Sequence, residues 1–364
     1  MTKDKKTKME SINIEQKVKS LLRLTAQQSA SDLHLAVGRY PMLRIDGKLC
    51  PLSQEKILAD KDTKAFSNVI LSEDKKKKLL ENGQVDSSYS LEDKARFRTN
   101  VFFQRGFISI AMRFITNKVR SLEELNLPPS LYDFTKFSKG LFLITGPIGH
   151  GKSTTLAALI DYINHNSDKH IITIEDPIEY IYKQDRCIIN QREIGQDAKS
   201  FNKALRAVFR EDANVVLIGE MRDLDTISTT ITAAETGHLI FATLHTNDSA
   251  QTVDRIIDIF PSHQQNQVRS QLSNVLLGVV SQRLIPKVGG DRTPALEIMI
   301  KNRAIENLIR ENKTYQIDNV IETSLKEGMT SMDRSLLNLV KEGVITIDDA
   351  LSYAKNRDYF KSVK

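Results

Sequence analysis

Residues 146–154 read Gly146-Pro147-Ile148-Gly149-His150-Gly151-Lys152-Ser153-Thr154. This stretch fits the pattern G-x-x-x-x-G-K-[ST], in which backbone N–H groups surround the phosphates of a bound nucleotide. Its three glycines can adopt backbone conformations that a Cβ atom would forbid, so successive N–H groups can converge on one anion. We expect Lys152 to neutralise the β- and γ-phosphates of ATP and the Ser153 hydroxyl to hold Mg²⁺.

The sequence around this stretch fits the strand, loop and helix order that a phosphate loop requires. Leu141–Thr145 is an apolar run long enough for a buried strand, and Leu156–Ile160 has a helical composition. The phosphates would then lie at the positive end of the helix. The alternative is a glycine-rich turn without function, and the flanking pattern argues against it.

Three further apolar runs alternate with helical stretches: Ile171–Ile174, Val215–Ile218 and Leu239–Thr243. Such alternation predicts an α/β fold, with a parallel sheet covered by helices on both faces. Ligands of such sheets bind beyond the carboxyl ends of the strands. From about residue 290 to residue 364 the pattern predicts a mostly helical part of the same domain, which begins at residue 140.

Residues of catalytic type follow these runs directly. Glu175, Glu220 and His245 each come at or just after the end of a predicted strand. Phosphoryl transfer requires mainly that water and Mg²⁺ be positioned and that negative charge be neutralised. We assign Glu220 to the Mg²⁺ hydration shell and Glu175 to the attacking water, although the two roles could be exchanged. His245 could sense the γ-phosphate or hydrogen-bond Glu220, and the alternative for each residue is a purely structural hydrogen bond.

The first third of the chain has a different pattern. Residues 1–12 are polar and expected to be disordered, and an amphipathic helix is predicted from Ile14. Alternating strands with a hairpin turn at Asp46-Gly47 follow, and these elements predict a small α+β domain at 13–118. The segment 119–139, which contains Pro128-Pro129, is predicted to be a linker.

Arginines in this first domain are candidates for stabilising charge in the reaction. Such an arginine often comes from another domain or subunit. Arg98 and Arg113 are the first choices and Arg105 is the third, because their domain has no phosphate loop of its own. Ion pairing with surface acids is the competing explanation. An arginine that crosses between subunits would require a closed ring with heterologous contacts.

Composition restricts the class of protein. A length of 364 residues suits two or three domains, and 52 basic against 46 acidic residues give a net charge of +6. Short lysine runs are usually solvated faces, with an anionic membrane or nucleic acid as the alternative. Cys50 and Cys187 support neither a disulfide framework nor a zinc site. Because no apolar run of about 18 residues and no signal segment occur, we expect a cytoplasmic protein that does not span a membrane.

Four motifs carry a resemblance to a known family: Glu175-Asp176-Pro177-Ile178-Glu179-Tyr180, Gln191-Arg192-Glu193-Ile194-Gly195, Gly219-Glu220-Met221-Arg222-Asp223 and residues 236–247, TGHLIFATLHTN. They resemble the Asp box, its following segment, the Walker B box and the His box of the secretion-superfamily ATPases. Within that superfamily the chain is most similar to the PilT-like type IV pilus retraction ATPases. Ala30–Leu35 together with Pro41–Leu49 resembles their PAS-like N-terminal domain, and Ala304–Glu311 resembles their segment associated with retraction.

The resemblance implies a RecA-like core preceded by the PAS-like domain, and a homo-hexamer in which ATP binds between the two. It implies a motor at the inner face of the cytoplasmic membrane that acts on the pilus platform protein, powering pilus retraction and twitching motility. By position, it assigns six functional side chains: Glu175 in the Asp box, Glu220 in the Walker B box, His238 and His245 in the His box, and the N-terminal arginines Arg98 and Arg113.

Other functions stay open at this point. In the segment associated with retraction, Glu306 replaces an arginine and Asn312 replaces a glycine. An accessory paralogue that depends on a sister motor, or another secretion-type ATPase, is therefore the alternative. A nucleic-acid translocase is a third reading because of the positive charge, but no platform of interleaved aromatic and basic residues supports it, so no nucleic-acid partner is expected.

Overall fold

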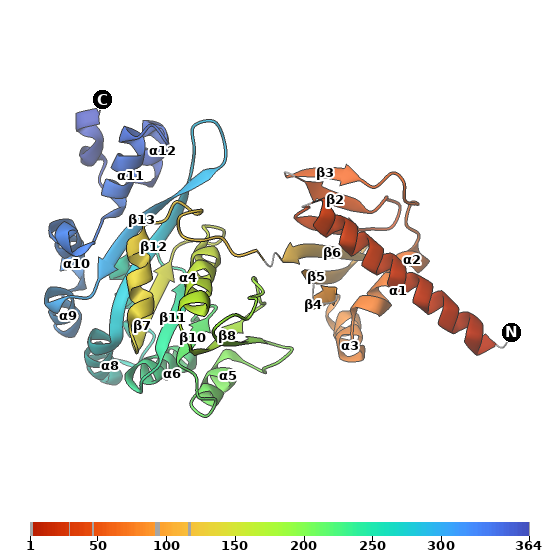
Figure 1. Ribbon diagram of the computed structural model, residues 1–364, viewed down its shortest axis with the longest axis horizontal. Coiled ribbons are helices and arrows are strands. Elements are labelled where there is room, and N and C mark those ends of the chain that lie inside the picture. Colours follow the sequence, from red (N-terminus) through yellow and green to blue (C-terminus); the bar gives the residue numbers. More distant parts are fainter. Residues whose placement is uncertain (1–2, 29, 46, 92–94, 116–117, 364) are drawn as a thin grey trace. The chain divides into compact units, whose positions relative to one another are not determined.

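The computed structural model describes residues 3–28, 30–45, 47–91, 95–115 and 118–363 (Figure 1). The chain divides into two compact units. The first comprises Met1–Lys118 and Glu179–Ile181, and the second comprises Val119–Ile178 and Tyr182–Lys364.

The first unit is a six-stranded antiparallel sheet with helices on one face. The sheet has the order β3-β2-β1-β6-β5-β4. Its elements are α1 (Lys3–Gln27), β1 (Asp32–Leu35), β2 (Met42–Ile45), β3 (Lys48–Pro51), α2 (Asp60–Ile70), α3 (Glu73–Asn82), β4 (Gln84–Leu91), β5 (Ala95–Gln104) and β6 (Phe107–Ile115). Side chains of the three helices pack on alternate residues of the strands, such as Phe97 and Val101 of β5. Arg98 and the other residues that alternate with these buried ones therefore lie on the opposite face of the sheet.

Two predictions for this unit need correction or qualification. The polar composition of 1–12 predicts disorder, but α1 already begins at Lys3, and only residues 1 and 2 of that segment lie outside the described residues. Lysine, glutamate and methionine are good helix formers, and extending a helix costs less than starting one. Asp46 of the predicted hairpin turn lies outside the described residues, while β2 and β3 on either side of it pair antiparallel.

The second unit is built on a seven-stranded sheet with the order β13-β12-β7-β11-β10-β8-β9. Its strands are β7 (Gly140–Thr145), β8 (His170–Glu175), β9 (Ile188–Glu193), β10 (Val215–Ile218), β11 (Leu239–Leu244), β12 (Leu276–Pro286) and β13 (Arg292–Ile300). Neighbouring strands run parallel, except that β13 is antiparallel to β12.

Helices cover both faces of this sheet, as the alternating pattern predicted. They are α4 (Lys152–Asn166), α5 (Phe201–Val208), α6 (Leu224–Glu235), α7 (Ser249–Asp258), α8 (Ser262–Val275), α9 (Arg303–Arg310), α10 (Ile317–Thr323), α11 (Met332–Lys341) and α12 (Ile347–Tyr353), with 3-10 turns η1 (Pro129–Lys136), η2 (Thr314–Gln316), η3 (Leu325–Glu327) and η4 (Arg357–Val363). Leu141 and Leu143 of β7 pack with α5 to α10 on one face. Phe142 points the other way, where its ring centroid lies 4.2 Å from that of Phe134 in η1.

The C-terminal part is less helical than predicted, because β12 and β13 form a long hairpin that extends past residue 290. Both strands contain β-branched residues, such as Val279 and Val280 of β12, and Gly289 and Gly290 at the turn have positive φ angles of 88° and 102°. The hairpin contributes to two hydrophobic cores, the main core of the sheet and a smaller one among the C-terminal helices. Its Ile285 and Ala295 pack with Met332, Leu336 and Phe360 of the C-terminal helices.

The segment 119–139, predicted to be a linker, belongs instead to the second unit. Leu122, Leu127 and Leu131 are buried there, and Phe134 is only 3% exposed. Prolines at 128 and 129 favour the extended and 3-10 conformations that this segment adopts, so they do not signal a free linker.

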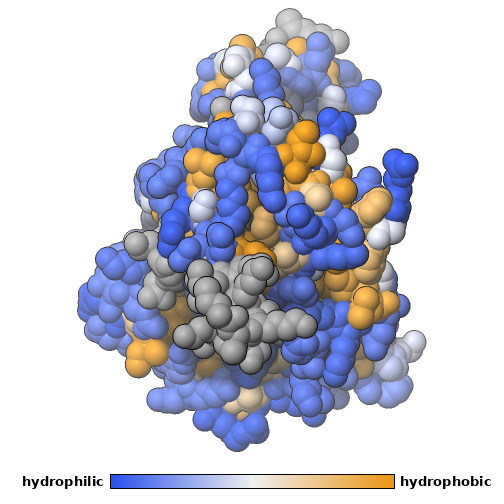
Figure 2. Space-filling model, turned by 90° about the vertical axis from the view of Figure 1, so that its right-hand side faces the viewer, coloured by the Kyte–Doolittle hydropathy of each residue, from blue (hydrophilic) through white to orange (hydrophobic). Residues whose placement is uncertain are grey.

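Among the described residues, no helix is both long enough and apolar enough to cross a membrane. On the face of the molecule shown in Figure 2, hydrophilic residues predominate and hydrophobic ones form small separate groups.

Replacing Phe134 by alanine should lower the free energy of unfolding of the second unit by about 3–5 kcal/mol, because a buried ring is lost from the face of β7. The matched control is Phe137→Ala, since Phe137 is 44% exposed and its removal should cost less than about 1 kcal/mol. Urea unfolding measures both. Equal small effects would mean that the segment 119–139 does not pack on the sheet.

Candidate active site

The phosphate loop joins β7 to α4, in the order that the sequence predicts. Gly146 and Gly151 have φ angles of 138° and 81°, which side chains other than glycine adopt only with strain. The Nζ atom of Lys152 donates to the carbonyl oxygens of Gly146 and Pro147, at 2.8 and 2.9 Å. The side chain of Lys152 is thus held folded over the loop at the start of α4, where the helix dipole favours an anion.

A neighbouring strand, β12, fixes the shape of this loop. Gln282 of β12 is buried, and its amide accepts a hydrogen bond from the Thr155 hydroxyl and donates one to the His150 carbonyl oxygen, both at 2.8 Å. A Cβ atom at Gly146 would lie 2.4 Å from the Gln282 carbonyl oxygen, so the loop approaches β12 as closely as glycine allows. The Leu284 N–H donates to Nδ1 of His150 at 2.9 Å.

The polar residues predicted at the strand ends do lie on one edge of the sheet. Parallel pairing places Thr145 of β7 beside Leu244 of β11, and Ala242 beside Ile218 of β10. His245 and Glu220 therefore emerge next to the phosphate loop. Glu175 ends β8, and the Gly219 N–H donates to the Ile174 carbonyl oxygen at 2.8 Å, which places the two acid-bearing strand ends side by side.

His245 joins the loop lysine to the Walker B acid. Lys152 Nζ lies 3.3 Å from Nδ1 of His245, and Nε2 of His245 lies 3.2 Å from Oε2 of Glu220. Because the ammonium group can only donate, Nδ1 accepts and Nε2 carries the proton that Glu220 accepts. Arg222 contacts the other oxygen of Glu220, with Nε 2.6 Å from Oε1. A neutral imidazole thus connects two charged groups that would both sense a γ-phosphate.

Glu175 is held separately and is only 8% exposed. The Thr173 hydroxyl donates to its Oε1 at 2.7 Å, and the Gln191 amide approaches the same atom at 3.5 Å. Gln191 belongs to β9, in the segment that follows the Asp box. A buried carboxylate with fixed donors has the defined orientation that positioning a water molecule requires.

The structure does not bring all of the predicted residues together. His238 precedes β11 at the opposite edge of the sheet, where its carbonyl oxygen accepts from the Gly140 N–H and its ring contacts Phe209. The six residues of β11 separate it from His245, about 20 Å along the strand. The structure therefore does not bring His238 together with Lys152, Glu220 and His245, because His238 precedes β11 whereas His245 follows it.

Arg98 and Arg113 lie in the first unit, directly opposite each other on β5 and β6. Both are exposed on the face of the sheet that the helices leave open. Nε of Arg113 donates to Oδ1 of Asp32 at 3.0 Å, so this arginine has an ion-pair partner within its own unit. Arg105 lies at the hairpin turn with a φ angle of 52°.

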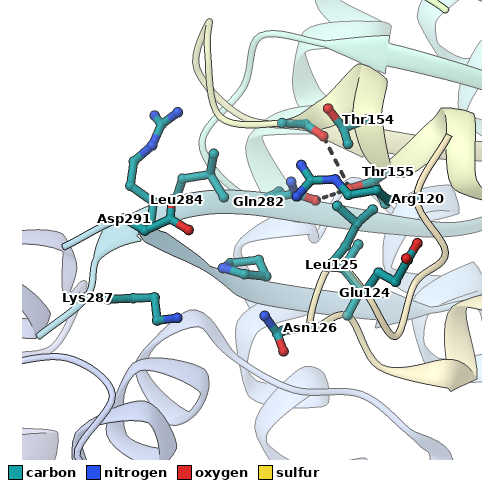
Figure 3. Close-up of a pocket in the computed structure, with 14 residues that line it drawn as sticks. Arg120, Glu124, Leu125, Asn126, Thr154, Thr155, Gln282, Leu284, Lys287 and Asp291 are labelled. Atoms are coloured by element: carbon teal, nitrogen blue, oxygen red, sulfur yellow. Dashed lines mark hydrogen bonds between the residues drawn. The ribbon is translucent and has the colours of Figure 1, made fainter. Parts of the chain in front are cut away.

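A cavity of about 190 Å³ opens beside the loop, next to Thr154 and Thr155 (Figure 3). Leu125 and Leu127 come from the segment 119–139 and Leu284 and Pro294 from the hairpin, and these apolar side chains are joined by the charged Arg120 and Arg292. The position suits the base and sugar of a nucleotide whose phosphates occupy the loop. These residues are not among those predicted from the sequence. Pro128 and Pro129 favour a linker, and the polar residues 281–283 interrupt the apolar pattern of β12, so Gly289-Gly290 is the local signal of the hairpin.

A phosphate loop on a parallel sheet, with two carboxylates and a histidine on the same edge, defines a nucleotide-binding α/β protein of the ATP-hydrolysing type. Residues 7–352 match the family described as type II/IV secretion system protein. The chain therefore belongs to this family, and it is an ATPase with a RecA-like core and an α+β N-terminal domain, as the sequence predicted.

Individual relatives are similar over almost their whole length. The type IV pilus retraction ATPase PilT of Pseudomonas aeruginosa is 44% identical over 343 residues, which cover 94% of this chain and 99% of that protein. The type IV pilus ATPase PilU of the same organism is 36% identical over 92% of this chain and 87% of that protein. A crystal structure of the pilus retraction motor PilT with bound ADP matches with a TM-score of 0.87 and 45% identity, covering 93% of this chain and 97% of that one.

The burial of His150, whose Nδ1 accepts the Leu284 N–H, makes the stability of the loop dependent on pH. Burial, helped by the nearby cations Arg283, Arg292 and Lys152, lowers the pKa of His150 below 6.5 in the folded protein. The neutral form is therefore favoured by folding, so its contribution is complete above pH 6.5 and is lost as the pH falls below that value.

We expect the thermal midpoint of the nucleotide-free protein to fall less between about pH 7.5 and about pH 5.5 in His150→Asn than in the unaltered chain, because the amide oxygen can accept the same hydrogen bond without titrating. Differential scanning calorimetry at several pH values provides the comparison. Identical pH profiles would show that His150 does not accept this hydrogen bond.

Proposed function

We propose that this chain is the Mg²⁺-ATP-driven motor that retracts type IV pili. The observation that carries the proposal is the chain of contacts from Lys152 through His245 to Glu220, in a protein 44% identical to a pilus retraction ATPase over 94% of its length. Identity to the type IV pilus ATPase PilU is lower, at 36%. Both changes in the segment associated with retraction are structurally compatible: Asn312 adopts a φ angle of 60°, which asparagine tolerates, and Glu306 pairs with Arg310 one helical turn later.

The residues at the edge of the sheet divide the chemistry of hydrolysis among them. Backbone N–H groups of the loop and Lys152 bind the phosphates, and the lysine exchanges its carbonyl partners for phosphate oxygens. His245, between Lys152 and Glu220, responds to the γ-phosphate. Glu175, held by Thr173 and Gln191, orients the attacking water, with the exchange of roles between Glu175 and Glu220 as the alternative.

The candidate ligands of Mg²⁺ are the Ser153 hydroxyl and, through water, Glu220. Among the described residues no group of three or more histidine, cysteine or acidic side chains could hold a metal ion. This agrees with the chemistry of Mg²⁺ in such sites, which keeps several water molecules and takes most other ligands from the nucleotide phosphates. When bound, the ion neutralises phosphate charge, while Glu220 keeps the hydration shell in place.

The remaining partners follow from the family. We infer a homo-hexamer that works at the inner face of the cytoplasmic membrane on the pilus platform protein, with a sister retraction ATPase as a further candidate partner. Within it, Arg98 and Arg113 supply positive charge to the nucleotide of another subunit. For Arg113 this requires exchange of Asp32 for a phosphate, which the more negative charge of the triphosphate favours.

Deleting the gene tests the cellular role. Cells that carry many surface pili but do not twitch are expected for loss of retraction, whereas bald cells would indicate extension. An accessory paralogue would leave the purified chain without ATP turnover of its own, so turnover by the purified chain separates that alternative from a motor.

Glu220→Gln should lower kcat for ATP at least about a hundred-fold while ATP binding persists, because the carboxylate that orders the water shell is lost but the loop is intact. The control is Glu211→Gln, which removes an acid that pairs with Arg192 and has no assigned role in the reaction. Turnover by phosphate release and binding by a fluorescent nucleotide are the two measurements. Normal turnover in Glu220→Gln would remove the catalytic assignment.

Mixing two inactive variants tests whether the arginine acts between subunits. Arg113→Ala and Lys152→Ala should each be inactive alone, and an equimolar mixture that exchanges subunits should recover about a quarter of the sites, where an intact loop meets an intact arginine. Arg39→Ala is the control and should stay active, because Arg39 is an exposed arginine of the same unit to which no role is assigned. No recovery in mixed rings would mean that Arg113 serves the nucleotide of its own subunit or none.

A further inference from the structure

The connection that carries His245 is short and anchored. Only three residues, Thr246, Asn247 and Asp248, separate His245 at the end of β11 from the start of α7 at Ser249. The Thr246 hydroxyl hydrogen-bonds that of Thr252 at 2.7 Å, and Arg283 of β12 donates to Asn247 Oδ1 at 2.8 Å. The orientation of His245 therefore depends on how firmly this connection is held.

Asp248 closes the connection and is almost fully buried. Its Oδ1 accepts the Gln251 N–H at 2.8 Å, which caps the N-terminus of α7. The next residue, Ser249, donates its N–H to Oε1 of Glu297 at 2.7 Å, and Glu297 is also buried. Two buried carboxylates thus hold the start of α7 and lie close to each other.

One cation from the C-terminal end of the chain compensates this charge. Nζ of Lys355 lies 3.2 Å from Oδ2 of Asp248, 3.7 Å from Oε2 of Glu297 and 3.1 Å from Oδ2 of Asp318. Lys355 follows α12, and its backbone is fixed because the N–H groups of Lys355 and Asn356 donate to the two oxygens of Asp333, at 2.8 and 2.9 Å. Lys355 is thus fixed at its ammonium group by carboxylates and at its backbone by Asp333.

The electrostatics of this cluster depend on Lys355. Burial, and then the nearby Asp248, raise the pKa of Glu297, while Lys355 and the Ser249 N–H lower it. Although burial alone would lower the pKa of Lys355, Glu297, Asp248 and Asp318 raise it well above its ordinary value. Without the cation, two buried like charges would face each other beneath the start of α7, which is strongly unfavourable.

We propose that Lys355 is a positioning residue for ATP hydrolysis: by pairing with Asp248 it fixes the connection after β11, so that His245 bridges Lys152 and Glu220. This inference rests on the proposed role of His245. Lys355, near the C-terminal end of the chain, would thus act on His245 indirectly. It contacts Asp248 at one end of the four-residue connection 245–248, and His245 lies at the other end.

The test is the steady-state ATPase activity of Lys355→Met, alone and combined with His245→Ala. Lys355→Met should lower kcat about ten-fold with little change in KM, because a displaced imidazole affects the reaction more than nucleotide binding. In the His245→Ala background, Lys355→Met should cause no further loss, since both changes remove the same interaction. Lys355→Arg should keep most of the activity.

Asp248→Asn tests the same contact without a buried unpaired charge. The amide oxygen still caps α7, so the thermal midpoint should change little, but kcat should fall as in Lys355→Met. Two controls report general effects of the C-terminal region. Lys361→Met removes an exposed lysine that pairs with Asp358, and Phe360→Leu loosens the C-terminal core; both should keep kcat at temperatures below their midpoints.

The outcomes separate the two hypotheses. Full turnover in His245→Ala would overturn the proposed role of His245, and with it the role of Lys355. Loss of turnover in His245→Ala with normal kcat in Lys355→Met or Asp248→Asn would overturn only the role of Lys355. A further loss when Lys355→Met is added to His245→Ala, or an equal loss in Phe360→Leu, would show that Lys355 acts through general stability.

Discussion

The buried amide of Gln282 is the contact on which the nucleotide site depends. Its side chain holds the second half of the phosphate loop and the first turn of α4, through the His150 carbonyl oxygen and Thr155, and its own backbone lies where any side chain at 146 would have to be. Both polar ends of the amide are satisfied, so burying it costs little and its orientation is unique. The loop is therefore shaped by β12 before any nucleotide binds.

This constraint explains which parts of the fold could be read from the sequence. Strands β7, β8, β10 and β11 are buried on both faces and appear as uninterrupted apolar runs, so their ends, and with them Glu175, Glu220 and His245, could be predicted. In β12, by contrast, Ser281, Gln282 and Arg283 interrupt the apolar pattern because they face the loop and the connection after β11. The polar residues that support the site are therefore the same ones that make β12 difficult to recognise in the sequence.

Other features depend on tertiary contacts that no local pattern reveals. The segment 119–139 has the prolines of a linker, but its buried leucines and the packing of Phe134 on Phe142 make it part of the second unit. His238 and His245 belong to one motif, yet β11 places them at opposite edges of the sheet. The motif identifies both histidines, but the length of the strand between them determines that only one of them can contact the residues at a given edge of the sheet. The cavity beside Thr155 likewise combines two segments that are more than 150 residues apart in the sequence.

The β12–β13 hairpin has a mechanical consequence. At one place it touches the phosphate loop through Gln282, and through Ile285 and Ala295 it is embedded among the C-terminal helices. A hydrogen-bonded two-stranded ribbon resists stretching. A displacement of the loop on exchange of ATP for ADP would therefore be transmitted through the hairpin to those helices. The last 70 or so residues would then move in response to the nucleotide. Because such coupling is reciprocal, a force applied to them would change the affinity of the loop for the nucleotide.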